Sequence, residues 1–463
     1  MRCATSLIRN LALAGCLFLA PAVSRGEDTS LSLPQARAVA GAALERGDYA
    51  LAIRLARGLI EADPRDTGAW YVVAAAQMRQ GNPRAARAAV TRAYRFAQTP
   101  ADKTRSAELA ARFALEENRP TMAQAWLRRA AIHIDDPDQE TRLARDYQAL
   151  RRINPFSFSL RTEVRPSDNV NSGSSAVYNV IDDVIAPDYP LASQALEGTV
   201  ATLDATAGYR LRASPTSATT LNGRLYVQRV SLASSTAAKA PLARDSDYGS
   251  TYVEVSLNHA FAVGEPEKKG SAAVDVALGE SWYGGERNFR TLQISGERNW
   301  RLGASSLFQL NARVEHRFDA RQPTNDADGL GLGMFYARKL ANGDGLSVSL
   351  ALRDTEAANF NGTYSSASVR TSYALAKPVG PARITAAVGA EYADYPMFRL
   401  SRVIPPTRRE DRSYYGEVSL FFPDFDYAGF APNLRLRAGR KTSNFSQYTS
   451  REISLSLGVQ SKF

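Results

Sequence analysis

The strongest constraint on the fold is an alternation of apolar and polar residues that recurs from residue 155 to the last residue. In the final segment, apolar residues occupy every second position from Ile453 to Val459, with small or polar residues between them. A period of two places successive side chains on opposite faces of a β-strand, whereas a helix shows a period near 3.6. This region is therefore predicted to consist of strands that each have one apolar and one polar face.

Fourteen segments follow this pattern, and each has roughly the 9–11 residues that a tilted membrane strand needs. They lie near residues 155–165, 198–212, 217–230, 248–262, 270–283, 288–300, 304–319, 328–341, 344–357, 362–377, 382–395, 411–423, 431–443 and 449–463.

The connections between these segments differ in length in a regular way. Those after even-numbered segments are mostly tight and rich in turn residues, as at 342–345 and 378–381. Several after odd-numbered segments are long, at about 166–197, 231–247 and 396–410. Short turns at one end and long loops at the other are typical of outer-membrane barrels with both termini in the periplasm. The pattern predicts an antiparallel transmembrane β-barrel of about 14 strands over residues 155–463.

A soluble β-sandwich or propeller is the alternative for this region. The apolar face is continuous in nearly every segment, which favours a surface that contacts lipid. Aromatic residues also stand near segment ends, where an interfacial girdle would lie. They are Trp282, Trp300, Tyr336, Tyr392 and Tyr415.

The last residues resemble an assembly signal. The chain ends in Phe463, and Gly458 and Ser456 precede it in the final alternating segment. This spacing is similar to the C-terminal signal that the barrel-assembly machinery reads, although Ser461 stands where an apolar residue is usual. The barrel-assembly machinery and outer-membrane lipid are therefore expected partners.

The first 26 residues are predicted to be a signal peptide. Arg2 and Arg9 precede an apolar run over residues 11–23, and residues 20–22 have the small-x-small form of a cleavage site. The run of about 13 residues is too short to span a membrane. As an alternative, residues 13–16 resemble a lipobox in which Cys16 would be acylated, but the apolar run continues beyond Cys16.

Residues 27–154 contain a repeat with a period of 34 residues. Gly47 is followed by Ala52, and the same pair recurs at Gly81 and Ala86. A third, degenerate unit begins near Asn118. This period, with glycine between paired helices and alanine where helices cross, is the pattern of tetratricopeptide repeats. A generic helical bundle is the alternative. The prediction is a periplasmic α-helical repeat domain over residues 27–154.

Repeat stacks of this kind normally bind peptides on a concave side. The first helix of each pair lines that side. For each side chain there, the alternative to partner binding is that it is merely solvated or packed against its neighbours. The residues predicted for this candidate partner-binding face are Arg37, Tyr71, Met78, Arg79, Glu108 and Arg112.

Fourteen strands are enough to enclose a lumen. The polar face of the segments carries charges of both signs, which are expected either to pair across the lumen or to line a path. Gly329, Gly331 and Gly333 share one face of a single segment, where they leave room inside or mark a kink in the sheet. The candidate lumen-lining residues are Arg224, Glu254, Asp275, Arg313, Glu315, Arg353, Arg383, Glu391, Arg435, Arg437 and Glu452.

The sequence lacks the motifs of catalytic, nucleotide-binding and metal sites. It contains three histidines, and its two cysteines, Cys3 and Cys16, both precede the predicted cleavage site. The formal net charge of +10 is spread along the chain, so nucleic acid is not an expected partner. We predict no enzyme activity, no cofactor and no metal site, although a barrel hydrolase whose catalytic residues are distant in sequence remains an alternative.

The junction between the two regions carries a family resemblance. Residues 154–160 are NPFSFSL and residues 165–175 are RPSDNVNSGSS. They resemble the start of the barrel in the surface lipoprotein assembly modifier (Slam) family, in which an N-P-aromatic-S-F strand precedes a P-x-x-N-[IV]-N-x-[AG]-S-S segment. Phe156 stands where that family more often has tryptophan.

The resemblance implies an outer-membrane translocator. Members of that family deliver particular lipoproteins, or soluble haem- and metal-scavenging proteins, from the periplasm to the cell surface, and their repeat domain faces the periplasm. Periplasmic chaperones would be further partners. The loop at 166–197 contains Asp182, Asp183 and Asp188. It is expected either to fold into the lumen as a plug or to contact the emerging substrate, and the alternative is an unconstrained surface loop.

Two other functions fit the same architecture. An exopolysaccharide-export porin also joins helical repeats to a barrel, but its lumen should favour one sign of charge. A passive or gated pore is the other alternative.

Overall fold

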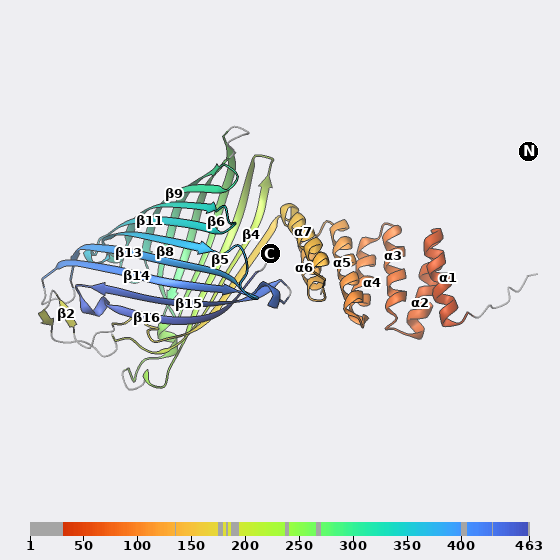
Figure 1. Ribbon diagram of the computed structural model, residues 1–463, viewed down its shortest axis with the longest axis horizontal. Helices are drawn as coiled ribbons and strands as arrows, with labels where there is room; N and C mark the ends of the chain where they lie inside the picture. The colour runs from red at the N-terminus through yellow and green to blue at the C-terminus, as the bar shows by residue number, and fades with distance from the viewer. Residues whose placement is uncertain are drawn as a thin grey trace, which may run out of the picture. The chain divides into compact units, whose positions relative to one another are not determined.

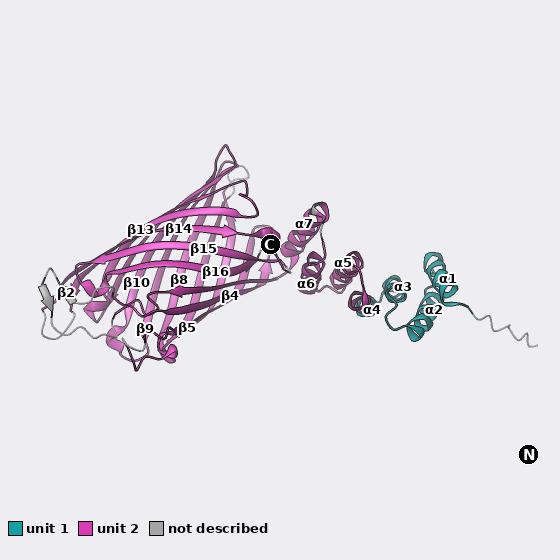
Figure 2. Cartoon of the chain, turned by 60° about the horizontal axis from the view of Figure 1, so that its bottom comes forward, with its two compact units in different colours: residues 1–89 teal, residues 90–463 magenta. Residues whose placement is uncertain are grey.

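The computed structural model describes residues 31–134, 136–174, 179–181, 184–186, 194–236, 240–264, 270–399, 405–427 and 429–461 (Figure 1). The described residues form two compact units, one ending at Ala89 and the other beginning at Val90 (Figure 2). The predicted signal peptide with Cys16, the loop aspartates Asp182, Asp183 and Asp188, and the terminal Phe463 lie outside the described residues.

The first unit consists of antiparallel helices. They are α1 (Leu33–Arg46), α2 (Tyr49–Ala62), α3 (Thr67–Arg79) and the beginning of α4 (Pro83–Phe96). Ala43, Ala52, Ile53 and Ala76 form a buried cluster between the first three helices. Small side chains at these crossings let the helices approach closely, as the repeat pattern requires.

Each helical pair turns at the position that the repeat pattern predicts. Gly47 has a φ of 83° and Gly81 a φ of 77°, a left-handed conformation that glycine adopts without a steric penalty. Asn118 has a φ of 56° at the equivalent place in the third repeat, and asparagine is the residue next best suited to it. Ala52, Ala86 and Ala123 each have an exposure of 0%. The predicted helical repeats are confirmed.

The second unit contains the rest of the helices and all of the strands. After α4 come α5 (Pro100–Glu116), α6 (Pro120–Ala131) and α7 (Pro137–Ile153). These three helices follow Thr99, Arg119 and Asp136, and each begins with a proline, which has no N–H to leave unpaired in the first turn. No helix among the described residues is both long and apolar enough to cross a membrane.

His133, which follows α6, lies between the helices of this unit. The Nε2 of His133 lies 3.1 Å from the hydroxyl of Tyr94, and the Tyr94 ring packs edge-on against Trp126. Burial, followed by the nearby charge of Lys103, lowers the pKa of His133.

The lowered pKa predicts a loss of helix stability in mild acid. As the pH falls below about 6.5, the unfolded chain binds a proton at this position before the folded chain does, so folding becomes less favourable. We expect the thermal midpoint of the helical signal at 222 nm to fall between pH 7.5 and pH 5.5 in the full-length protein. His133→Gln should reduce that fall, and an unchanged pH dependence in this variant would contradict the assignment.

The strands form a closed antiparallel barrel in which neighbours in sequence are neighbours in space (Figure 1). A small separate sheet of β2 (Asn179–Ile181) and β3 (Val184–Ala186) lies within the first long connection. The fourteen barrel strands are β1 (Phe156–Ser167), β4 (Gly198–Ala213), β5 (Ser217–Leu232), β6 (Ser250–Val263), β7 (Gly270–Tyr283), β8 (Glu286–Leu302), β9 (Ser306–Asp319), β10 (Ala327–Lys339), β11 (Gly345–Ala357), β12 (Tyr364–Ala374), β13 (Arg383–Phe398), β14 (Thr407–Phe421), β15 (Phe430–Ser443) and β16 (Ser450–Ser461). The predicted 14-strand barrel is confirmed.

Large apolar side chains are exposed on one face of the barrel strands. Leu278 and Val388 are each 62% exposed and Leu457 is 59% exposed. A closed sheet with polar residues on one face and exposed aliphatic residues on the other suits lipid outside and water inside. The barrel is therefore a transmembrane barrel, and the opposite face of each strand lines its lumen.

One connection is shorter than the sequence pattern indicates. Residues 396–410 are expected to form a long loop, but β13 continues to Phe398 and β14 begins at Thr407. The register of this pair shifts between Tyr395 and Phe398. Pro396 lies within this irregularity. Because proline has no N–H to donate, an interrupted stretch of the ladder tolerates it, and pairing resumes beyond it.

Candidate functional site

The predicted lumenal charges all lie on the inner face of the barrel. In each strand they alternate with the exposed apolar residues, as Arg435 and Arg437 do with Leu436 in β15. Several form ion pairs with neighbours on the same face: Arg224 with Asp204 (2.9 Å) and Arg353 with Glu315 (3.2 Å). Five of them take part in no ion pair with any described residue, namely Glu254, Asp275, Arg313, Arg383 and Glu391.

The glycine row of β10 makes room for side chains of neighbouring strands. A Cβ atom at Gly333 would lie 2.5 Å from the amide of Asn311, and one at Gly329 would lie 3.6 Å from the guanidinium of Arg353. The row therefore accommodates polar side chains along the inner wall, so these glycines leave room inside the barrel.

The most distinctive part of the inner wall is the junction of β1 and β16, which we call the seam. Among the described residues, only four positions pair there, Arg161–Val164 with Leu457–Gln460. Other neighbouring strands of the barrel pair at ten or more positions. The seam is thus where the backbone ladder that closes the barrel is shortest.

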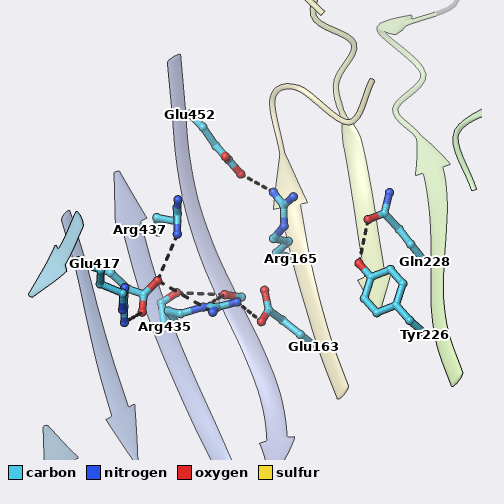
Figure 3. A network of polar contacts seen from close by, with 10 residues as sticks. Glu163, Arg165, Tyr226, Gln228, Glu417, Arg435, Arg437 and Glu452 are labelled. Atoms are coloured by element: carbon cyan, nitrogen blue, oxygen red, sulfur yellow. Dashed lines mark hydrogen bonds and ion pairs between the residues drawn. The ribbon is translucent and has the colours of Figure 1, made fainter. Parts of the chain in front are cut away.

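Side chains cross the seam both within the backbone ladder and beyond its end (Figure 3). The Nη1 of Arg165 in β1 lies 2.6 Å from Oε1 of Glu452 in β16. Glu163 of β1 reaches past β16 and pairs with Arg435 of β15. Ion pairs thus supplement the few backbone hydrogen bonds at this junction.

The network continues from Arg435 to a buried carboxylate on β14 (Figure 3). Glu417 has a side chain that is only 8% exposed, and three guanidinium groups face it. Arg370 lies at 3.2 Å, Arg437 at 3.5 Å and Arg435 at 4.0 Å. The ring of Tyr415 lies against Arg437, with 3.7 Å from the guanidinium carbon to the ring centre. One carboxylate therefore holds together β12, β14 and β15.

A second buried ion pair lies at the opposite end of β14. Arg409 and Asp411 are 6% and 4% exposed, with 2.5 Å between Nη2 and Oδ2, and Lys441 lies 2.8 Å from the same carboxylate. The guanidinium of Arg409 lies over the rings of Tyr448 (3.2 Å) and Tyr395 (4.3 Å). Aromatic faces and a carboxylate together stabilise this buried cation.

The lumenal candidates predicted from the sequence do not include Glu163, Arg165, Arg370, Glu417 or the Arg409–Asp411 pair. The same alternation assigns each of them to the inner face, because each stands next to outward-facing residues of its strand. Nothing in the local sequence distinguishes them from other inner charges, since their importance comes from partners on other strands.

The predicted assembly-signal residues that are described lie at the seam. Ser456 is 3% exposed, and its hydroxyl donates to the carbonyl oxygen of Arg435 at 3.3 Å. A Cβ atom on Gly458 would lie 2.4 Å from the carbonyl oxygen of Thr162 in β1. Glycine at this position therefore lets the two strands approach.

This close approach predicts that Gly458→Ala weakens the closure of the barrel. The added methyl group meets a backbone oxygen, which cannot move aside without separating β1 from β16. When samples are heated before electrophoresis, we expect the gel band of the folded variant to disappear at a lower heating temperature than that of the parent barrel. Gly416→Ala is the matched control, because nothing lies within 4 Å of the position of its added Cβ. If both variants lose the folded band at the same temperature, the contact between position 458 and β1 does not determine how firmly the barrel closes.

The candidate partner-binding residues lie on three helices. Arg37 of α1 donates from Nε to Oδ2 of Asp66 at 2.8 Å, so this side chain has a structural contact. Tyr71, Met78 and Arg79 lie on α3, and the next two candidates, Glu108 and Arg112, lie one turn apart on α5. The first four residues belong to one compact unit and the last two belong to the other.

Glu108 is exposed at its surface, but neighbouring groups still partly desolvate its carboxyl group. Burial raises the pKa of Glu108, and the negative charge of Asp146 raises it further, whereas Arg142 opposes both effects. The carboxyl group of Glu108 is thus held in surroundings that disfavour its charged form.

Comparisons with known proteins agree with this architecture. Residues 43–102 match the family model of the tetratricopeptide repeat. No curated protein sequence matches the chain.

Three solved structures illustrate the similarity. A loop-deletion mutant of OmpT, an outer membrane protein of Vibrio cholerae, is 7% identical and covers 66% of this chain and 99% of its own, with a TM-score of 0.33. The outer membrane channel DcaP of Acinetobacter baumannii is 7% identical and covers 66% and 97%, with a TM-score of 0.36. The Yersinia enterocolitica secretion chaperone SycD, in complex with a peptide of the translocator YopD, is 20% identical and covers 28% and 98%, with a TM-score of 0.24.

Proposed function

We propose that this protein is an outer-membrane translocator that delivers particular lipoproteins, or soluble haem- or metal-scavenging proteins, from the periplasm to the cell surface. Three features support the proposal: a transmembrane barrel with a charged inner wall, helical repeats before it, and the Slam-like sequence at their junction. In this proposal the repeats face the periplasm, where they bind the substrate or a chaperone. The barrel is inserted into the outer membrane by the barrel-assembly machinery.

The observation that carries the proposal is the structure formed by the Slam-like residues. Asn169 accepts a hydrogen bond from the N–H of Gly173 (2.7 Å) and donates one to its carbonyl oxygen (2.8 Å). Asn171 donates to the carbonyl oxygen of Gln194 (2.8 Å) and accepts from the N–H of Leu196 (3.0 Å). A Cβ atom at Gly173 would lie 2.4 Å from the carbonyl oxygen of Gln194. Each of these motif residues therefore has a defined role in one compact turn.

The other end of the motif is equally well defined. Asn154 is 2% exposed, and its Oδ1 accepts hydrogen bonds from the hydroxyl of Thr121 (3.0 Å) and the N–H of Phe156 (3.1 Å). Its carbonyl oxygen accepts a hydrogen bond from Arg210 of β4 at 2.7 Å. The motif thus supports both the start of β1 and the turn that follows it, which is what a sequence shared by barrels of one kind would need.

Delivery to the surface is tested by co-expression in a Gram-negative host that lacks both proteins. The probe is an epitope-tagged copy of an exported lipoprotein or scavenging protein of the same organism, scored by antibody labelling and protease access on intact cells. We expect surface or medium appearance only with the full-length protein. A variant that lacks residues 27–150 tests whether the repeats are required.

Two results would contradict the proposal. If the tagged protein stays in the periplasm while the barrel is folded in the outer membrane, protein translocation is wrong. A large steady conductance in planar bilayers would then favour a passive pore, and loss of surface polysaccharide on deletion of the gene would favour polysaccharide export.

A further inference from the structure

The direction of the backbone groups in β1 explains where the backbone ladder at the seam ends. In an antiparallel pair, the N–H and C=O of one residue point toward the same neighbouring strand, and successive residues point to opposite sides. The N–H of Arg210 donates to the carbonyl oxygen of Pro155 at 2.8 Å, so odd-numbered residues of this segment face β4. The even-numbered residues Thr162, Val164 and Pro166 therefore face β16.

Pro166 is the residue at which the next hydrogen bond to β16 should form. Proline has no N–H, so it cannot donate to a neighbouring strand. The β1–β4 register continues through Pro166 to Ser167, whereas the β1–β16 register stops at Val164. Proline is found at edges of sheets for this reason. Residues 450–456 of β16 thus pair with β15 and have no register partner on β1.

Side chains close the part of the seam that lacks backbone pairing. The Arg165–Glu452 ion pair spans it at 2.6 Å, with side chains that are 25% and 37% exposed. Beyond the strands, the hydroxyl of Ser174 donates to the carbonyl oxygen of Ser446 at 2.9 Å, which joins the loop after β1 to the loop before β16. Partly exposed ion pairs and single hydrogen bonds are worth far less than a continuous ladder. This part of the seam can therefore open at a lower free-energy cost than any complete junction.

We infer that the seam is a lateral exit, and that the edge of β16 over residues 450–456 is a docking surface for an extended segment of the transported polypeptide. The inference rests on the proposed function and names where in the barrel the substrate passes. An unpaired strand edge in a membrane is costly because lipid offers no hydrogen-bond partners. An extended chain added to that edge satisfies its N–H and C=O groups.

The side chains of this edge define the kind of segment that fits. Ile453 and Leu455 point outward and are 53% and 49% exposed, whereas Ser454 and Ser456 are buried on the inner side. A segment paired with this edge would need to alternate in the same way, with apolar residues toward lipid and small or polar residues toward the lumen. A lateral exit also lets the acyl chains of a lipoprotein stay in the membrane while its polypeptide crosses.

The exit is tested by stapling the seam with a disulfide. Arg161 and Gln460 are register partners on the inner face, and Arg161→Cys with Gln460→Cys links β1 to β16. The control, Ser366→Cys with Ala393→Cys, links β12 to β13 within a complete ladder. The native cysteines, Cys3 and Cys16, both precede the predicted cleavage site, so each pair would provide the only two thiols of the exported chain.

The readout is surface delivery of the same tagged exported protein, with and without reductant. We expect the oxidised seam staple to abolish delivery, a reductant to restore it, and the control staple to leave it unchanged. Normal delivery through an oxidised seam staple overturns the lateral exit while the proposed function stands. Failure of the unstapled parent to deliver the protein overturns the proposed function, and this inference with it.

A second measurement locates the substrate directly. A photo-crosslinking amino acid at Leu455, on the free edge, should form an adduct with the tagged protein during transport. The control is Leu352, which faces outward from β11 and is similarly exposed, at 44% against 49% for Leu455. Adducts at both positions, or at neither, would contradict docking at the β16 edge.

Discussion

Replacing Arg409 by methionine is expected to destabilise the barrel strongly, with the largest loss of any single substitution in its buried charge clusters. Methionine keeps much of the aliphatic length of the side chain but removes the charge that faces Asp411, which is 4% exposed. Breaking a buried ion pair typically costs about 3–5 kcal/mol. Lys441, 2.8 Å from the same carboxylate, compensates part of this cost. The contact of Arg409 with the ring of Tyr448 adds to the loss, since a desolvated cation–π contact is worth about 2 kcal/mol.

The adjacent arginine provides a matched control. Arg408 also forms ion pairs, with Asp394 at 2.8 Å and Glu410 at 3.6 Å, but its side chain is 59% exposed. Exposed pairs contribute little, because solvent screens them and both side chains lose freedom when they pair. Urea unfolding of the refolded barrel in lipid vesicles should therefore show a large loss for Arg409→Met and a small one for Arg408→Met. Similar losses would mean that burial does not determine the contribution of this pair.

The second large effect is expected from Glu417→Gln. The glutamine has the same shape, but the three guanidinium groups at 3.2–4.0 Å lose the negative charge that they share, and only Arg435 keeps a second carboxylate partner in this network, Glu163. We expect a loss of about 3 kcal/mol in the same unfolding measurement, within the range for removing one partner of a buried ion pair. A more positive inner wall should also make any residual conductance more selective for anions.

The control for Glu417 is a carboxylate in an exposed pair. Glu286 lies 2.9 Å from Arg321, and both side chains are more than half exposed. Glu286→Gln should therefore change neither the unfolding free energy nor the ion selectivity measurably. If Glu417→Gln behaves in the same way, the three arginines do not depend on its charge, and the network in Figure 3 does not stabilise the barrel.

The Glu417 cluster lies next to the seam that we propose as the exit. The Glu417 cluster lies on the side of the seam formed by β15 and β14, and through Arg435 it is connected to Glu163 of β1. If the seam opens, the Glu163–Arg435 pair must break while Glu417 still compensates the charge of Arg435. The wall beside the exit can then keep its shape while β1 moves away from it.

Most of the fold could be predicted from the sequence because the signals for it are local. Alternation with a period of two identifies each barrel strand, and the same alternation assigns Arg224, Glu315 and Arg437 to the inner face, where all three lie. The repeat spacing predicts the left-handed turns at Gly47 and Gly81 because only a few residue types adopt that conformation readily. The one misjudged connection, at 396–410, depends on an irregular register that the local pattern does not reveal.

The sequence by itself determined the strands, the face on which each residue lies and the helical repeats, since these follow from the chemistry of neighbouring residues. Only the tertiary structure decided which charges meet. Glu417 and Arg370 are 47 positions apart, and Glu163 and Arg435 are 272 positions apart, so their pairing depends on strand register and on barrel closure. Pro166 illustrates both levels. Its missing N–H can be read from the sequence, but only the closed barrel places that missing donor toward β16, where the ladder ends and residues 450–456 have no register partner on β1.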